Sequence, residues 1–301
     1  LNCKVCQLVK LYKDGKPLYQ SHVIHEIDDI KIAVIGLATE YIPFWEKPEN
    51  IVGLEFLDVV ETTKKVIKEN ELKSKSDLIV VLYHGGYEKD LETNESFGPQ
   101  TIENKGFELF ENVDVDLLLT GHQHIPKVYK RNDRVTLQTS HNAKDFGLVT
   151  IQFELTNEKT NVKDVNGSIK SFSEYPIDDQ IESLIADDIR KTNHFLSKQI
   201  SSVNLDMSIA SPLSCRVKKH PLFQLINQIQ LEYTKADISV SSLPNETHGF
   251  PRHITLNDVA VNFPYENDLV VLEVTGALLK SALEQNATYF NVENSQVVID
   301  S

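Results

Sequence analysis

The stretch 76-SDLIVVLYHGG-86 predicts a buried β-strand that ends at a histidine followed by two glycines. Its unbroken run of aliphatic and β-branched residues is typical of a strand covered on both faces. A similar run, 30-IKIAVIGL-37, precedes it, and a third, in 115-VDLLLTGHQH-124, follows it. Between these runs, apolar residues recur at helical spacing over 53–71 and, less regularly, over 102–113. Strands that alternate with helices in this way form parallel sheets with right-handed crossovers, so we predict an α/β layered fold.

After Lys127 the apolar residues change from helical spacing to alternation. In 148-LVTIQFEL-155 every second residue is apolar, which predicts antiparallel strands, and Asn166-Gly167 predicts a two-residue hairpin turn. The stretch 176–200 then carries an apolar stripe at helical spacing and begins with Pro176, a residue that suits the first position of a helix. We expect this helix to connect two domains.

The last third of the chain has mixed α/β character. Its predicted elements are helices at 221–233, 255–261 and 276–287 and strands at 237–242 and 269–274. We therefore predict a first domain at 1–175, a linker helix at 176–200 and a second domain at 201–301.

Charge and cysteine content limit the classes of function. A formal net charge of −14 argues against a duplex nucleic acid surface, because binding a polyanion requires a basic stripe. No stretch is long and apolar enough for a membrane span. The three cysteines, Cys3, Cys6 and Cys215, cannot all pair within one chain, and we interpret them as ordinary thiols. A zinc module that uses Cys3 and Cys6 with a histidine is the alternative.

Three histidines follow the predicted parallel strands. His84 ends the run at 76–86, and His122 and His124 come directly after the run at 115–119. Open α/β sheets bind ligands at this edge, so we expect these imidazoles to bind metal ions. His122 and His124 are separated by one residue and would point apart in an extended loop, which suits two different ions. The alternative is that they are exposed loop histidines without a ligand, since a GHxH motif is short.

These motifs resemble two known families in sequence order. The pair 83-YHGG-86 and 121-GHQH-124 resembles the last two motifs of the calcineurin-like metallophosphoesterases. The stretches 254-ITLNDV-259, 264-PYEN-267 and 274-VTGALLKSALE-284 resemble the C-terminal domain of the 5′-nucleotidase family. The resemblance implies an α/β fold in which a partial layered metallophosphoesterase domain precedes a partial mixed α/β 5′-nucleotidase C-terminal domain.

The resemblance also implies a dinuclear metal centre. In the family pattern His84 and His122 would bind one divalent ion, such as Mn²⁺ or Zn²⁺, and His124 would bind a second. The family's earlier motifs, which carry the remaining ligands, have no counterpart in this sequence. We therefore expect a chain truncated at both ends that holds about half of the metal ligands, and we assign no catalytic acid or base within it.

Four residues of the second domain match substrate-binding positions of the resembled family. Tyr265 matches an aromatic residue that stacks on the base, and Asn267 matches an asparagine that contacts it. Arg216 lies where relatives have a phosphate-contacting arginine, and Arg252 is a displaced substitute for another. From the residues alone, Tyr265 fits equally well as a loop aromatic that packs on its own domain, and Arg216 as an exposed arginine.

The resemblance implies hydrolysis of nucleotide phosphoesters, with a small-molecule nucleotide as the binding partner. The stretch 41-YIPFWEKPENIVGLEF-56 is most similar to the 2′,3′-cyclic-nucleotide phosphodiesterase branch, so 2′,3′-cyclic nucleotides, nucleoside monophosphates or both are the expected substrates. The alternatives are a hydrolase of nucleotide sugars or other phosphoesters and a catalytically incomplete nucleotide-binding fragment. The resemblance favours an extracytoplasmic or cell-envelope location, and a cytoplasmic one stays open.

Overall fold

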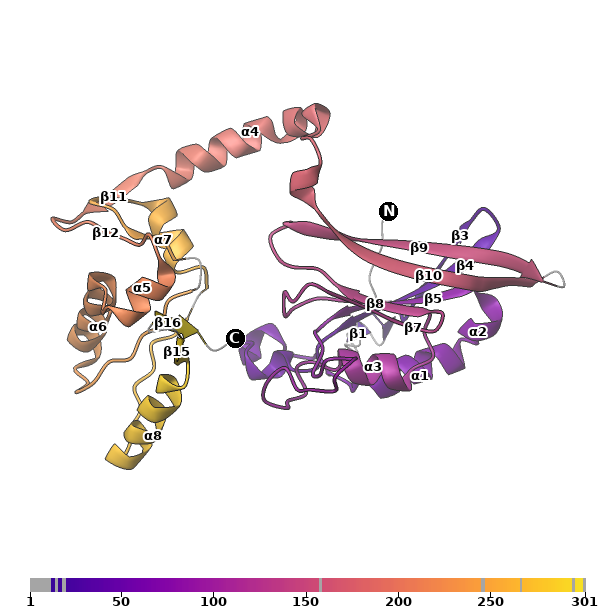
Figure 1. Ribbon diagram of the computed structural model, residues 1–301, viewed down its shortest axis with the longest axis horizontal. Coiled ribbons are helices and arrows are strands. Elements are labelled where there is room, and N and C mark those ends of the chain that lie inside the picture. Colours follow the sequence, from indigo (N-terminus) through magenta and orange to yellow (C-terminus); the bar gives the residue numbers. More distant parts are fainter. Residues whose placement is uncertain are drawn as a thin grey trace. The chain divides into compact units, whose positions relative to one another are not determined.

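The computed structural model divides into two compact units, Leu1–Pro176 and Ile177–Ser301, which we call unit 1 and unit 2 (Figure 1). The structure describes residues 12–13, 16–17, 20–156, 159–244, 247–265, 267–293 and 296–299. Cys3 and Cys6 lie outside these residues, and Cys215 is a buried thiol in unit 2. The predicted assignment of 1–175 and 201–301 to two functional domains joined by a linker helix at 176–200 stays a prediction.

Unit 1 is built on a six-stranded sheet with the strand order β3-β4-β5-β6-β8-β7. The inner strands β4, β5, β6 and β8 run parallel, and each edge strand pairs antiparallel with its neighbour. The strands are β3 (Val23–Ile27), β4 (Ile30–Ala38), β5 (Leu78–His84), β6 (Leu117–Thr120), β7 (Lys127–Arg131) and β8 (Arg134–Gln138). A short hairpin, β1 (Tyr12–Lys13) and β2 (Lys16–Pro17), precedes them. This sheet confirms the predicted α/β fold.

Both faces of the sheet are covered, which explains the unbroken apolar runs of its inner strands. The helices α1 (Val59–Glu69), α2 (Leu72–Lys75) and α3 (Gly106–Asn112) lie on one side, and the ribbon of β9 (Asp145–Thr156) and β10 (Lys159–Ser171) lies on the other (Figure 1). Side chains alternate between the faces. On β5, Ile79 and Val81 join the core under the helices, whereas Leu78 and Val80 join the core under the ribbon.

The predicted hairpin turn at Asn166-Gly167 is wrong. Both residues lie inside β10, where Asn166 pairs with Thr150 and Gly167 with Val149. A Cβ atom on Gly167 would lie 3.0 Å from side-chain atoms of Val128 and Val135, so the glycine lets the ribbon approach the sheet closely. The local turn preference of the dipeptide is thus overridden by packing.

Unit 2 begins with the predicted connecting helix, α4 (Asp179–Leu196). Pro176 lies before this helix and is not its first residue, because the side chain of Asp178 caps the helix by accepting from the backbone N–H groups of Gln180 and Ile181. No helix of the described residues is both long and apolar enough to cross a membrane.

The rest of unit 2 is a set of helices and short two-stranded ladders. Its helices are α5 (Pro212–Val217), α6 (Pro221–Thr234), α7 (Leu256–Asn262) and α8 (Gly276–Ala287). Its ladders pair β11 (Gln199–Ser202) with β14 (His253–Thr255), β12 (Met207–Ser208) with β13 (Gly249–Phe250), and β15 (Phe290–Glu293) with β16 (Gln296–Ile299). A small core around Leu222, Phe250 and Ile254 joins α6 to the ladders that contain β13 and β14.

The strands predicted at 237–242 and 269–274 are wrong for this structure. Both stretches are described, yet neither takes part in a ladder. Val240, Val270 and Leu272 are exposed despite their strand preference. A β-strand needs a neighbouring strand whose backbone forms hydrogen bonds with its N–H and C=O groups. Within the described residues, neither stretch has such a neighbour.

Two tyrosines of unit 1 offer a matched test of buried hydrogen bonds. The Tyr129 hydroxyl donates to the carboxylate of Asp90 at 2.8 Å, whereas the Tyr87 hydroxyl bonds the neutral hydroxyl of Thr136 at 2.7 Å. We expect Tyr129→Phe to lower the free energy of unfolding by about 1.5–3 kcal/mol and Tyr87→Phe by about 1 kcal/mol, because a bond to a charged group is stronger. Trp45, the only tryptophan of the chain, lies in unit 1, so its fluorescence in urea reports this unit. Equal losses would contradict the charge argument.

The same carboxylate predicts a pH dependence. The backbone N–H groups of Glu92 and Thr93 and the Tyr129 hydroxyl hold the pKa of Asp90 well below its usual range. A carboxyl whose pKa is lower in the folded state stabilises the fold above its unfolded pKa of about 3.9. We expect this stabilisation to be complete at neutral pH and to disappear only as the pH falls through the lower folded pKa. Urea titrations at a series of pH values measure this. Asp90→Asn should have a lower free energy of unfolding than the wild-type chain at neutral pH, and the difference between the two should shrink only at acid pH.

Candidate functional site

The candidate site lies at the carboxyl edge of the inner parallel strands. His84 is the last residue of β5, and the loop 121-GHQH-124 follows β6 directly. Backbone hydrogen bonds continue past the strand ends, from Thr39 N–H to the His84 carbonyl at 3.0 Å and from Gly121 N–H to the Gly85 carbonyl at 3.1 Å. The loops therefore stay aligned, and the rings of His84 and His122 contact each other with their centroids 5.4 Å apart.

The third predicted histidine takes a different neighbour. The ring of His124 stacks on that of His141, with the centroids 5.0 Å apart and the planes 27° from parallel. His141 belongs to the turn after β8, and sequence reasoning assigned it no role. The structure thus brings two predicted histidines together and places the third beside a fourth. Their metal-binding role stays a prediction.

The GHQH loop adopts a backbone conformation that side chains other than glycine seldom take. His122 has φ of 71° and His124 has φ of 61°, both in the left-handed region. Gln123 between them stabilises this conformation, because its side-chain amide accepts from Tyr87 N–H at 2.7 Å and donates to the Tyr87 carbonyl at 2.8 Å. Gly86 leaves room for this amide, since a Cβ there would lie 2.0 Å from Gln123 Oε1. Such strained residues are concentrated at functional sites.

Two further side chains reach His122 from irregular segments. The carboxylate of Glu103, from the connection between β5 and α3, lies 2.8 Å from His122 Nε2. The ring of Trp45, which follows the 3₁₀ turn η1 (Ile42–Phe44), lies 5.4 Å from the His122 ring. Sequence reasoning missed both residues. Trp45 is the single tryptophan of the chain and lies in the stretch 41–56 that resembles the phosphodiesterase branch, but nothing in the sequence distinguishes Glu103 from other loop acids.

The environment of His84 favours the neutral imidazole. Burial lowers the pKa of His84, and the charges that His122 and His124 would carry lower it further. A neutral imidazole has a free lone pair, which is the form that binds a metal ion.

The donors fit a divalent cation of the zinc or manganese class in type but form an incomplete set. Imidazole nitrogens suit such ions, and a carboxylate is a common companion ligand. Within the described part of the chain, however, no group of three or more His, Cys, Asp or Glu side chains is arranged to hold a metal ion. His84 and His122 therefore fit part of a metal shell.

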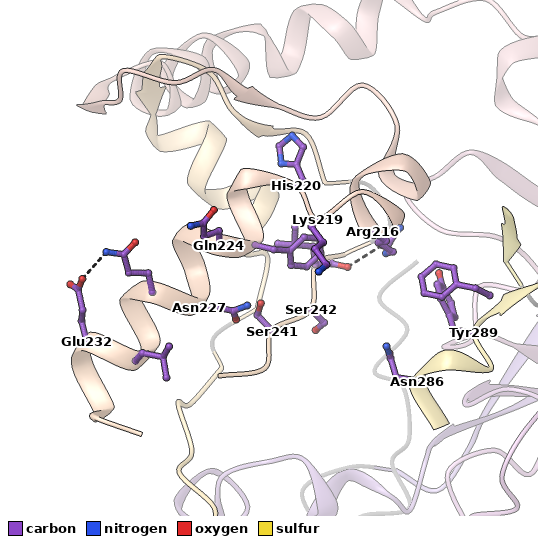
Figure 2. A pocket seen from close by; sticks show the side chains of 15 residues that line it. Arg216, Lys219, His220, Gln224, Asn227, Glu232, Ser241, Ser242, Asn286 and Tyr289 are labelled. Carbon is purple, nitrogen blue, oxygen red and sulfur yellow. Dashed lines mark hydrogen bonds between the residues drawn. The ribbon is translucent and has the colours of Figure 1, made fainter. Parts of the chain in front are cut away.

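Unit 2 contains a cavity of about 970 Å³ that includes one predicted substrate residue (Figure 2). Arg216 lines it and donates to the carbonyls of Leu243 at 3.1 Å and Pro244 at 3.2 Å. The other lining residues are Lys219, His220, Phe223, Gln224, Asn227, Gln228, Leu231, Glu232, Ser241, Ser242, Leu243, Asn286, Tyr289 and Phe290. They combine cations, amides and aromatic rings, a set that sequence reasoning missed apart from Arg216.

The remaining predicted substrate residues do not line this cavity. Tyr265 is 73% exposed, and both Asn267 and Arg252 are exposed. The backbone carbonyl of Arg252 accepts from Val203 N–H at 2.9 Å. Substrate binding by Arg216, Arg252, Tyr265 and Asn267 stays a prediction.

Comparison with known proteins identifies the class. Residues 198–299 match the family described as the 5′-nucleotidase C-terminal domain. A candidate 5′-nucleotidase from Staphylococcus aureus, solved in complex with α-ketoglutarate, is 31% identical, with a TM-score of 0.82 over 99% of this chain and 57% of its own. A 5′-nucleotidase precursor from Thermus thermophilus, at 20% identity and a TM-score of 0.58 over 86% of this chain and 52% of its own, shares the fold. The fold is that of the 5′-nucleotidases, with a calcineurin-like domain followed by the C-terminal domain.

Sequence relatives agree with this class. A 2′,3′-cyclic-nucleotide 2′-phosphodiesterase/3′-nucleotidase from Yersinia enterocolitica is 23% identical over 93% of this chain and 49% of the relative. A 5′-nucleotidase from Vibrio cholerae is 45% identical over 24% of this chain and 13% of the relative. The predicted resemblance to the 5′-nucleotidase family is confirmed by the match of residues 198–299 and by these relatives. It spans about half the length of the first curated relatives that it matches.

The two hydrogen bonds between the Gln123 side-chain amide and the backbone of Tyr87, which we call the Gln123 clamp, should contribute to the stability of unit 1. We expect Gln123→Ala to lower the free energy of unfolding of unit 1 by about 1–3 kcal/mol, because it leaves the backbone N–H of Tyr87 without its partner. Gln152→Ala, on an exposed position of β9, is the matched control and should change stability by less than about 0.5 kcal/mol. Urea unfolding followed by Trp45 fluorescence measures both. Equal stability of the two variants would show that the clamp is dispensable.

Proposed function

We propose that this chain carries the histidine part of a dinuclear metal centre that hydrolyses nucleotide phosphoesters, namely 2′,3′-cyclic nucleotides and nucleoside monophosphates. The ring contact between His84 and His122 at the carboxyl edge of parallel strands is the observation that carries the proposal. The Yersinia enterocolitica relative, named for cyclic-nucleotide and 3′-nucleotide hydrolysis, supports this choice of substrates.

Each histidine has a defined part in the proposed centre. His84 and His122 would hold one divalent ion, and His124 would hold the other. When bound, two such ions polarise a phosphate ester and provide a hydroxide nucleophile near neutral pH. The chain itself contributes rigid imidazoles, one kept neutral by burial, and a loop conformation fixed by Gln123.

The cavity of unit 2 supports binding of the nucleotide. Its volume of about 970 Å³ is at the upper end of ordinary small-molecule sites. Arg216 and Lys219 offer positive charge for a phosphate, and Phe223 and Tyr289 offer aromatic faces for a base. Tyr265 and Asn267 are the alternative base site, which the family resemblance favours and which their exposure leaves accessible.

Two other functions fit specific observations. A nucleotide-binding role without hydrolysis fits the incomplete metal shell of the described residues. Hydrolysis of nucleotide sugars or other phosphoesters fits the same histidines and the same cavity, and a panel of substrates separates it from the proposed activity.

A substitution at the sheet edge tests the proposed activity. Hydrolysis of 2′,3′-cyclic AMP and AMP would be measured with added Mn²⁺, on the 301-residue chain and on a version extended to the length of the relatives. We expect His122→Ala to lower the rate of the active form by more than about 100-fold, because even the loss of a ligand's own partner costs about 10–100-fold. His25→Ala is the matched control, since its strand β3 pairs it with Ile32 at the opposite end of β4.

The outcomes of this assay separate the alternatives. Activity that falls with His122→Ala and persists with His25→Ala supports the proposed hydrolase. Metal binding without hydrolysis of any phosphoester in either form would sink the proposal and support the nucleotide-binding role. Activity that survives His122→Ala would remove this histidine from the centre.

Two neighbouring lysines test the cavity as the nucleotide site. Lys219 lines it, whereas the adjacent Lys218, which is also exposed, does not. We expect Lys219→Ala to weaken AMP binding about tenfold, equivalent to about 1.4 kcal/mol, through loss of a cation near the phosphate. Lys218→Ala should leave the affinity within about twofold. Isothermal titration calorimetry measures both, and Tyr265→Ala in the same series identifies the alternative base site if it alone weakens binding.

A further inference from the structure

We infer that Glu103 is a positioning residue of the proposed centre, whose carboxylate accepts the Nε2–H of His122 and leaves Nδ1 as the atom that binds the cation. This inference rests on the proposed function and assigns His122 Nδ1 as a metal-binding atom of the proposed centre. It is carried by the 2.8 Å separation of Glu103 Oε1 and His122 Nε2 and by the way both residues are held.

The carboxylate stands on a segment that is fixed at three consecutive residues. The Glu103 carbonyl accepts from Thr39 Oγ1 at 2.7 Å and from the Tyr83 hydroxyl at 3.3 Å, so it is tied to the ends of β4 and β5. Asn104 Oδ1 accepts from Gly86 N–H at 2.7 Å. These bonds join the segment to the same strand ends that carry the candidate site.

Lys105 completes the support. Its ammonium group pairs with Glu40 at 2.9 Å and with Asp58 at 2.6 Å, and the side chains of Lys105 and Glu40 are only 13% and 10% exposed. Asp58 is also the N-cap of α1, so the ion pairs join the segment to the helical layer. A largely buried, doubly paired lysine is costly to displace, and this gives Glu103 the rigid backing that a positioning group needs.

His122 is equally restrained. Its backbone follows the bond from Gly121 N–H to the Gly85 carbonyl and precedes the Gln123 clamp. Its ring lies against Trp45 and His84, with both centroid distances at 5.4 Å. The bond to Glu103 therefore joins two fixed groups.

The chemistry of imidazole then assigns the atoms. A neutral imidazole has one N–H donor and one lone pair, on different nitrogens. An ionised carboxylate can only accept, so Nε2 carries the hydrogen and Nδ1 carries the lone pair. A carboxylate on the distal N–H of a ligand histidine fixes its tautomer and ring orientation and raises its basicity. Among the three predicted metal histidines, only His122 has a carboxylate partner within the described residues.

The first test uses the metal-free protein and so does not depend on hydrolysis. In ¹H–¹⁵N spectra of histidine-labelled protein at mildly alkaline pH, with His122→Ala for assignment, we expect a protected Nε2–H of His122. Glu103→Gln keeps an acceptor oxygen and should keep this signal, whereas Glu103→Ala should lose it to exchange with water. An Nδ1–H tautomer in the wild-type chain, or an equally protected Nε2–H in Glu103→Ala, would overturn the inference.

The second test titrates Zn²⁺ alone into the same proteins. We expect Zn²⁺ binding to shift the Nδ1 resonance of His122 while Nε2–H persists, and Glu103→Ala to weaken the affinity about 10–100-fold. Glu103→Gln should lose less Zn²⁺ affinity than Glu103→Ala, because its side-chain oxygen still accepts the hydrogen bond from His122 Nε2–H although it carries no charge. Glu92→Ala removes an exposed glutamate from the same connection and should leave the affinity within about twofold.

Three further outcomes separate a failure of the inference about Glu103 from a failure of the proposed function. Equal losses of affinity in Glu103→Gln and Glu103→Ala, with Nε2–H still present in Glu103→Gln, would make Glu103 a ligand and overturn its positioning role. A wild-type chain that binds no Zn²⁺ would overturn the assignment of Nδ1 together with the proposed centre. Zn²⁺ binding that follows the expected order in a chain without phosphoesterase activity would sustain the inference while the proposed hydrolysis fails.

Discussion

The parallel register of β4, β5 and β6 is the constraint on which the candidate site depends. It aligns Ala38 with His84 and Leu82 with Leu119, so the chain leaves the two central strands at nearly the same height. The backbone bonds at Thr39 and Gly121 extend this alignment past the strands. Residues that are far apart in sequence meet there because the sheet, buried on both faces, permits no shift in register.

This constraint explains why the sequence predicted part of the site. The three apolar runs identify the parallel strands, and the rule that their carboxyl ends share an edge places His84 near His122. No equivalent rule reaches Glu103 or Trp45, because they come from irregular connections whose paths depend on contacts such as the pairing of Lys105 with Glu40 and Asp58. His141 beside His124 was missed for the same reason. Local patterns thus predicted the scaffold and one ring contact, but not the groups that surround it.

Errors in the predicted fold have a related origin. Asn166-Gly167 has a strong turn preference, yet packing of β10 on β7 and β8 decides its conformation. The apolar stretches 237–242 and 269–274 have strand preference, yet a ladder requires a neighbour that propensity cannot supply. Helices were predicted more closely because their signals are local. Thr255 and Asp258, for example, form a capping box at the start of α7.

The charges of each unit limit how it could bind a phosphate ester. A chain with a formal charge of −14 repels a phosphate ester at long range, so any binding must come from positive charge concentrated close to the ligand. In unit 2, Arg216 and Lys219 supply it at the cavity. In unit 1 the site is made of imidazoles, one of them kept neutral by burial, and a carboxylate, so its own groups offer an anion little attraction. Such a site would suit a phosphate ester only if cations provided the positive charge, and this requirement is the chemical reason why the proposed hydrolysis depends on metal ions.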